Sequence, residues 1–259
     1  MQSRIPQPPW PPLGRRLEST LRKALHDHAM LENVSKVAIA LSGGKDSMTL
    51  LFLLKAISGH GFPPLDIHAI HVGGSFSCGA GVNVPYLQDV CSQLGVNFIL
   101  REAFQDISTL ECYSCSRERR RLLFQAAQEV GCNTIAFGHH RDDNAQTVLM
   151  NLFHKGSFEG MLPKITMHAY GVTILRPMIY IAEADVRKFA EQQGFARIMC
   201  RCPVGQNSMR KQVDDLLNDI EGMYPHVRSN VANAGLRLGT RKAEEMPERF
   251  REANKLNLI

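Results

Sequence analysis

One short stretch decides the fold of this chain: Val37-Ala38-Ile39-Ala40-Leu41-Ser42-Gly43-Gly44-Lys45-Asp46-Ser47. It begins as an apolar run, which predicts a buried strand, and the apolar segment from Met48 to Ile57 that follows predicts a helix. The turn between them presents backbone N–H groups at a helix N-terminus, where the helix dipole favours an anion, and its glycines let a ligand approach closely. We therefore predict a phosphate-binding loop, made of Ser42, Gly43, Gly44, Lys45, Asp46 and Ser47.

Two common phosphate-binding motifs do not describe this loop. The Walker A motif requires a glycine five residues before its Gly-Lys pair, and Ile39 stands at that place. The spacing of the dinucleotide motif, G-x-G-x-x-G, is also missing from the loop. An ordinary polar turn between a strand and a helix is the alternative, but it would not need this specific order of residues.

The bulk composition is that of a soluble globular protein. The chain has 259 residues, of which 44% are hydrophobic and 21% charged, enough for one α/β domain with small appendages. It contains no run of about 18 apolar residues, which a membrane helix needs, and its Pro-rich start lacks the apolar core of a signal peptide. We therefore expect a cytoplasmic protein with no membrane partner. The formal charge of +5 permits a polyanionic partner without requiring one.

Predicted strands and helices alternate along the chain. Strands are expected at 36–41, 65–72, 96–101, 134–137 and 172–175, and helices at 14–30, 48–58, 85–94, 116–130, 144–154, 182–193 and 208–223. This alternation predicts a doubly wound α/β fold, with a mostly parallel sheet flanked by helices. Ligands of such sheets bind at the C-terminal ends of the strands. The phosphate loop, the Gly73-Gly74 loop and the Gly138-His139 turn should therefore meet in one crevice.

The expected organisation has three parts. Residues 1–30 form a Pro-rich start and an N-terminal helix, and residues 31–225 form the nucleotide-binding domain. Residues 226–259 are polar with little apolar periodicity, so we expect a flexible tail there.

A second polar cluster follows the fourth predicted strand: Gly138-His139-His140-Arg141-Asp142-Asp143. A glycine at this point lets a ligand approach, a histidine can bind phosphate or move a proton, and a carboxylate can hold Mg²⁺ beside a triphosphate. The alternative role for one of the two aspartates is to cap the helix that follows. We expect Gly138, His139 and Asp143 to contact the nucleotide, because their strand lies in the same sheet as the phosphate loop.

Four arginines gather within five residues: Arg117, Arg119, Arg120 and Arg121. Such a cluster can neutralise RNA phosphates. A solvated helix face is the alternative, and the cluster alone does not decide between the two.

The cysteines indicate metal or redox chemistry rather than disulfides. Seven is an odd count in a chain without a secretion signal. Cys112-x-x-Cys115 can clamp a metal or a cluster, and Cys200-x-Cys202 is an awkward spacing for two ligands of one ion. Three thiolates leave one iron of an iron–sulfur cluster without a protein ligand. Cys91 and Cys132 stand alone and are expected to be buried.

Together these motifs resemble the TtcA family of tRNA 2-thiocytidine synthetases, within the PP-loop ATP pyrophosphatase superfamily. The resemblance covers residues 34–225. It rests on the phosphate loop, on Cys112-x-x-Cys115-Ser116-Arg117-x-Arg119-Arg120, on Gly138-His139-His140-Arg141-Asp142-Asp143-x-x-Gln146-Thr147, and on Gly160-Met161-x-Pro163-Lys164, Arg176-Pro177 and Cys200. Three features depart from the family pattern: the Pro-rich start, His71-Val72-Gly73-Gly74 after the second strand, and Cys200-x-Cys202 where the family has Cys-x-x-Cys.

The resemblance implies an adenine nucleotide α-hydrolase-like fold and a specific set of site residues. It implies that Cys112, Cys115 and Cys200 hold a [4Fe–4S] cluster, with Cys202 the alternative third ligand. It further implies Mg²⁺ on Asp46, catalytic roles for Lys45, Asp46 and Cys200, and ATP as a substrate. The expected partners are tRNA, bound through the arginine cluster, a sulfur donor such as a cysteine desulfurase, and a second copy of the chain in a homodimer.

The implied activity is ATP-dependent thiolation of a tRNA cytidine in the anticodon loop, at position 32. The C2 oxygen would be adenylylated, pyrophosphate would leave, and sulfur would replace the oxygen as AMP departs. Two alternatives stay open: a PP-loop enzyme that thiolates a uridine, and a zinc-bound module that binds a nucleotide and RNA without catalysis. The absorption spectrum and metal content separate the last from the other two.

Overall fold

The computed structural model describes residues 5–74, 82–104, 112–195 and 209–237. They form two compact units, which are described separately. The first combines residues 1–140 with 164–208, and the second combines 141–163 with 209–259. In the described residues, no helix is both long and apolar enough to cross a bilayer.

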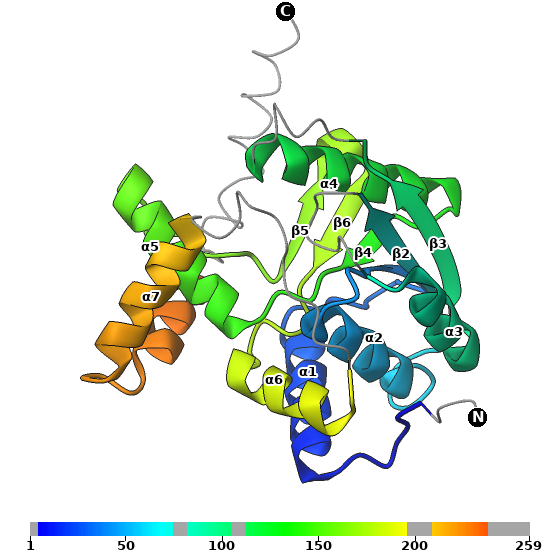
Figure 1. The fold of residues 1–259 in the computed structure, drawn as a ribbon, viewed down its shortest axis with the longest axis horizontal. Coiled ribbons are helices and arrows are strands. Elements are labelled where there is room, and N and C mark those ends of the chain that lie inside the picture. The colour runs from blue at the N-terminus through cyan, green and yellow to red at the C-terminus, as the bar shows by residue number, and fades with distance from the viewer. Residues whose placement is uncertain (1–4, 75–81, 105–111, 196–208, 238–259) are drawn as a thin grey trace, which may run out of the picture. The chain divides into compact units, whose positions relative to one another are not determined.

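The first unit contains a six-stranded sheet with the order β3-β2-β1-β4-β6-β5 (Figure 1). Its strands are β1 Lys36–Ala40, β2 Asp66–Gly73, β3 Asn97–Glu102, β4 Thr134–Ala136, β5 Lys164–Met167 and β6 Val172–Leu175. All neighbouring strands pair in parallel except β5 and β6. The predicted mostly parallel, doubly wound α/β fold is confirmed.

In the described part of the first unit, five helices flank this sheet: α1 Pro12–Asp27, α2 Lys45–Ile57, α3 Val84–Leu94, α4 Cys112–Glu129 and α6 Glu183–Gln192. Figure 1 shows α4 on one face of the sheet and α1, α2 and α6 on the other. This division follows from the strand order, because right-handed crossovers put α2 on one side of β1 and the returning α4 on the opposite side.

Strand β1 lies at the centre of the sheet and is covered on both faces. Val37, Ala38 and Ile39 are fully buried, which is why this strand reads as a continuous apolar run rather than an alternating one. On the α4 face, Ala38 packs in one cluster with Ile70, Ile135 and Phe124. The central position of β1 places the residues that follow it at the middle of the sheet edge.

Strand β5 was not predicted. Residues 156–171 contain several glycines and read as an irregular segment. The structure instead pairs β5 antiparallel with β6, through a 3₁₀ turn at His168–Tyr170 and Gly171, whose φ is 61°. Four residues at a sheet edge are too few for a clear alternating pattern, so pairing with β6 decides this strand.

The Pro-rich start is anchored to the first unit. Trp10 is 3% exposed and packs edge-on against Phe189 of α6, with ring centroids 5.6 Å apart. A Cβ on Gly14 would lie 2.7 Å from the Cβ of Trp10, so this glycine lets α1 approach the tryptophan. Residues 5–11 therefore contribute to the core, because one aromatic side chain among the prolines finds an apolar pocket.

The second unit contains α5 Arg141–Lys155, α7 Met209–Glu221 and a further helix at residues 227–237. The flexible tail predicted from residue 226 is wrong for this last helix, while residues 238–259 lie outside the described part. Ala232 and Leu217 are fully buried and pack with Ala145 and Val213. Only a few apolar residues form this cluster, so the sequence of the segment shows little apolar periodicity. The predicted domain limits at 31 and 225 stay a prediction.

Candidate nucleotide site at the carboxyl edge of the sheet

The phosphate loop joins β1 to α2 and is shaped by its own side chains. Gly43 has a φ of 82°, a left-handed conformation that favours glycine. The Gly44 N–H donates to Ser42 Oγ at 3.3 Å, and Ser47 Oγ donates to the Gly44 carbonyl at 3.0 Å. The two serine hydroxyls lie 3.1 Å apart. The loop is thus held in a defined shape by its own side chains, at the N-terminus of a 13-residue helix.

Lys45 lies between two carboxylates. Its Nζ is 3.0 Å from both side-chain oxygens of Asp46 and 3.1 Å from Glu183 Oε1. Burial alone would lower the pKa of Lys45, but the two carboxylates outweigh it and raise the pKa above its ordinary value. Burial likewise would raise the pKa of Glu183, yet Lys45, together with His140 and Arg187, lowers it to about 2. Lys45 and Glu183 are therefore both charged at neutral pH.

Strand β4 places Gly138 and His140 of the second predicted cluster beside the phosphate loop. A Cβ on Gly138 would lie 2.9 Å from the Asp46 carbonyl carbon, so only a glycine permits this close approach. His140 is 4% exposed, and its Nε2 lies 3.8 Å from Asp46 Oδ1. The ring of His139 instead stacks on Phe137, at 5.5 Å between centroids. The expected meeting of the phosphate loop and the Gly138 turn is confirmed, with β1 and β4 as adjacent strands.

This meeting point is the topological switch of the sheet. The chain leaves β1 toward β2 on one side, whereas β4 pairs with β1 on the other. Crevices at such points are where open α/β sheets bind ligands. A phosphate placed on the loop would meet backbone N–H groups, the α2 dipole and Lys45.

His71 buttresses the start of the loop. It is 1% exposed, and its Nδ1–H donates to the Leu41 carbonyl at 2.7 Å. Burial lowers the pKa of His71, against the opposing effect of that hydrogen bond. A neutral imidazole therefore fixes the residue that precedes Ser42, in a position where the sequence departs from the family pattern.

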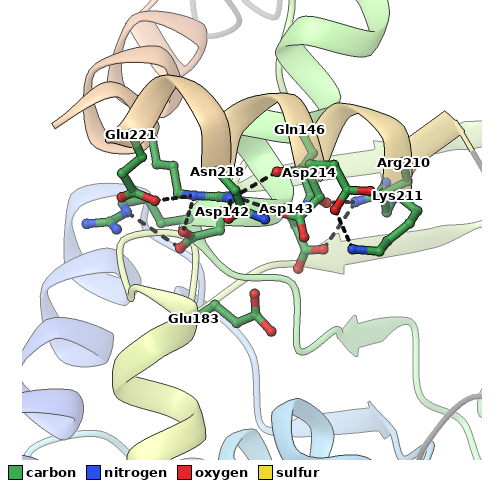
Figure 2. A network of polar contacts seen from close by, with 12 residues as sticks. Asp142, Asp143, Gln146, Glu183, Arg210, Lys211, Asp214, Asn218 and Glu221 are labelled. Atoms are coloured by element: carbon green, nitrogen blue, oxygen red, sulfur yellow. Dashed lines mark hydrogen bonds and ion pairs between the residues drawn. The ribbon is translucent and has the colours of Figure 1, made fainter. Parts of the chain in front are cut away.

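Asp143 lies in the first turn of α5, in the second unit, within a network of polar contacts (Figure 2). Its Oδ1 accepts from Arg210 Nη1 at 3.1 Å, and the same guanidinium donates to Gln146 Oε1 at 3.2 Å. Asp214 of α7 accepts from Gln146 and from Arg228, at 3.0 Å in each case. A role for Asp143 in binding nucleotide or Mg²⁺ stays a prediction.

The arginine cluster and the first cysteine pair belong to α4. Arg117, Arg120 and Arg121 are exposed, whereas Arg119 is half-buried. The guanidinium of Arg121 donates to Glu118 and to Gln125. Cys115 is half-buried, and Cys112 occupies the first residue of the helix. Residues three apart lie on the same side of a helix, so this spacing suits two ligands of one metal group.

The other cysteines divide into two kinds. Cys91 and Cys132 are 0% and 1% exposed, as predicted, and burial raises the pKa of the Cys91 thiol to about 12. Cys200 and Cys202 lie outside the described residues. Within the described ranges, no three metal-binding side chains come together.

Sequence reasoning missed Glu183, Arg210 and Arg228. Glu183 is the first residue of α6, where an acidic side chain ordinarily complements the helix dipole, so it carried no separate signal. Arg228 falls in the segment expected to be a tail, yet it is 7% exposed. Only its burial distinguishes it from a solvated arginine.

Comparison with known proteins defines the class. Residues 13–198 match the model of the PP-loop domain family. The chain belongs to this family, whose fold and loop position agree with the geometry above.

Individual sequence relatives identify a narrower family within the PP-loop domain class. The chain is 33% identical over 237 residues to the tRNA-cytidine(32) 2-sulfurtransferase of Syntrophotalea carbinolica, covering 86% of this chain and 88% of that one. It is 36% identical over 234 residues to the enzyme of the same name from Verminephrobacter eiseniae, covering 86% and 72%. The chain therefore belongs to the tRNA-cytidine(32) 2-sulfurtransferase family.

A solved structure shares the fold. The U34-tRNA thiolase NcsA from Methanococcus maripaludis, determined with its [4Fe-4S] cluster, superposes with a TM-score of 0.70 at 24% identity. The match covers 88% of this chain and 80% of that protein.

Proposed function

We propose that this protein is an ATP-dependent tRNA sulfurtransferase that replaces the C2 oxygen of cytidine 32 with sulfur. The observation that carries the proposal is the preformed phosphate loop, with Lys45 at a helix N-terminus, in a chain of the tRNA-cytidine(32) 2-sulfurtransferase family. Uridine is the less favoured target, because the neighbour that acts on U34 is 24% identical and supports the fold alone.

The first half of the reaction is activation of the base. The C2 oxygen attacks the α-phosphate of ATP, an oxygen–phosphorus bond forms, and the bond to pyrophosphate breaks. Backbone N–H groups of Gly43 and Gly44, the Ser42 and Ser47 hydroxyls and Lys45 stabilise the charge that develops on the leaving group. In this proposal Gly138 and His139 contact the nucleotide from the β4 side.

Asp46 fits a Mg²⁺ site. Both of its oxygens face a cation, the Lys45 ammonium, and its side chain is 33% exposed. Carboxylate oxygen is the ligand that Mg²⁺ takes beside nucleotide phosphates. In this proposal Asp46 is one protein ligand, and the phosphates and water supply the rest.

The second half is sulfur transfer. Sulfide adds at C2, the bond from C2 to the adenylylated oxygen breaks, and AMP leaves as the sulfide proton is lost. Cys112, Cys115 and Cys200 would hold a [4Fe–4S] cluster; three thiolate donors, two of them in one helical turn, fit that group. When bound, it supplies an iron without a protein ligand at which sulfur can be delivered. A donor such as a cysteine desulfurase would provide the sulfur as a persulfide, and a thiol would reduce it to sulfide while being oxidised to a disulfide.

The tRNA would lie against α4. The exposed Arg117, Arg120 and Arg121, with Arg119 beside them, offer cations for RNA phosphates. The target base must leave its loop to reach a site at the sheet edge. Cytoplasmic location and a homodimer belong to this proposal, and gel filtration with light scattering tests the second.

Nucleoside mass spectrometry tests the function. Transfer RNA is digested from a strain that lacks the gene, with and without a plasmid copy. We expect 2-thiocytidine to disappear on deletion and to return with the plasmid. A change in 2-thiouridine instead would replace the cytidine assignment with uridine, and no change in any thionucleoside, with zinc in the purified protein, would favour a binding module.

A further inference from the structure

Glu183 is the one carboxylate from a distant segment that the described residues place on Lys45. It stands at the start of α6, and its side chain is 25% exposed. Its Oε1 lies 3.1 Å from Lys45 Nζ and also 3.1 Å from Arg187 Nη2, one turn further along α6. Glu183 thus links the phosphate loop to a helix that lies more than a hundred residues away in sequence.

The link is rigid because α6 is packed against α2. Phe189 of α6 is fully buried, and Phe195, just after the helix, stacks on Phe52 of α2 at 4.8 Å between centroids. Arg187, one turn further along α6, also donates to the Glu183 carboxylate. A carboxylate fixed in this way can define where a flexible lysine side chain points.

We propose that Glu183 is a positioning residue that aims the Lys45 ammonium at the leaving pyrophosphate. An ammonium has three N–H donors. In the structure they face both oxygens of Asp46 and Oε1 of Glu183. A phosphate oxygen would replace one of the two Asp46 contacts, while Glu183 keeps its own. Asp46 alone cannot fix this direction, because it neighbours Lys45 on the same turn and moves with it, whereas Glu183 comes from a separate helix. The inference rests on the proposed function.

The test is a double-mutant cycle on single-turnover pyrophosphate release, measured with full-length protein, unmodified tRNA and saturating ATP. Lys45→Ala should slow the step by about 10² to 10³-fold. Glu183→Ala should slow it by up to about 10²-fold, since a misplaced group loses most of its effect. In the Lys45→Ala background, Glu183→Ala should change the rate by no more than about twofold, because its effect acts through the lysine.

Two further variants separate positioning from folding. Glu183→Gln keeps a hydrogen-bond acceptor at the same place and should recover part of the rate that Glu183→Ala loses. Glu191→Gln removes an exposed carboxylate from the same helix and should leave the rate unchanged. Thermal melting of each variant shows whether the fold is intact.

The outcomes are distinct. If the losses from Lys45→Ala and Glu183→Ala multiply in the double variant, or if Glu183→Ala alone has no effect, the positioning role is wrong. If the unaltered protein releases no pyrophosphate with tRNA and ATP, the proposed function fails instead, whatever the variants do.

Discussion

At the scale of single residues, the cysteines give the most specific prediction about the site. Cys112 and Cys115 share one turn of α4, whereas Cys91 and Cys132 are buried in the core as inert thiols. A thiolate must be accessible and deprotonated to bind iron, and burial with a raised pKa opposes both. Burial therefore disfavours Cys91 and Cys132 as cluster ligands, and Cys112, Cys115 and Cys200 remain the proposed ligands.

We predict that Cys112→Ala, Cys115→Ala and Cys200→Ala each abolish the iron–sulfur cluster and tRNA thiolation, while ATP binding persists. The reason is that the phosphate loop belongs to a different segment and needs no thiolate for its shape. Iron and sulfide analysis of anaerobically purified protein measures the first effect, and equilibrium dialysis with ATP the second.

Cys202→Ala is the matched control, because it lies two residues from Cys200 and should keep the full cluster. A full cluster in Cys200→Ala together with its loss in Cys202→Ala would move the third ligand to Cys202.

At the scale of elements, α5 and α7 are held together by polar contacts as much as by apolar ones. Arg228 donates to Asp214 and Glu221 at 3.0 Å each and to Asn218 at 2.6 Å. Figure 2 shows these acceptors along α7 and Asp142 at the start of α5. The acidic groups outweigh burial and raise the pKa of Arg228, so it stays charged. Removing it would leave several carboxylates facing one another.

We predict that Arg228→Ala destabilises the second unit by about 3 kcal/mol, the usual effect of removing one partner from a buried ionic network. Hydrogen exchange measured by mass spectrometry should show faster exchange of α5 and α7 amides. Arg210→Ala provides the comparison: its side chain is 41% exposed, so it should cost about 1 kcal/mol or less. Equal exchange in the two variants would refute the central role of Arg228.

At the scale of the whole molecule, charge is nearly balanced, with a formal charge of +5 on 259 residues. Affinity for a polyanion must then come from a local concentration of cationic side chains rather than from the net charge of the whole chain. The exposed arginines of α4 are such a concentration, beside the cysteine pair. This arrangement would put the tRNA backbone near the chemistry.

We predict that Arg117→Ala with Arg120→Ala weakens tRNA binding and reduces the slope of log K against log salt by about 0.7 to 0.9 per arginine. Fluorescence anisotropy with labelled tRNA at several salt concentrations measures the slope. Arg16→Ala removes one positive charge from α1, where the guanidinium pairs with Asp185, and should leave the slope unchanged. A reduction by Arg16→Ala equal to the reduction per arginine in α4 would show that only net charge matters.

Local sequence patterns were enough to predict several features of the structure. A buried strand, two glycines and a helix N-terminus define the phosphate loop, the alternation of strands and helices defines the parallel sheet, and the spacing Cys112-x-x-Cys115 puts two cysteines within one turn of α4. Each depends on residues within a few positions of one another. Backbone conformation and side-chain periodicity act over that range.

Only the tertiary structure decided the contacts between distant segments. Lys45 pairs with Glu183, Gly138 approaches Asp46, and Trp10 and Arg228 are buried. The residues joined in each case share no local sequence pattern. The physical reason is that the sequence around an acidic residue at a helix start, or around an arginine in a polar segment, is the same whether the side chain is solvated or ion-paired. Its role is set when packing of the core fixes which helix ends face each other.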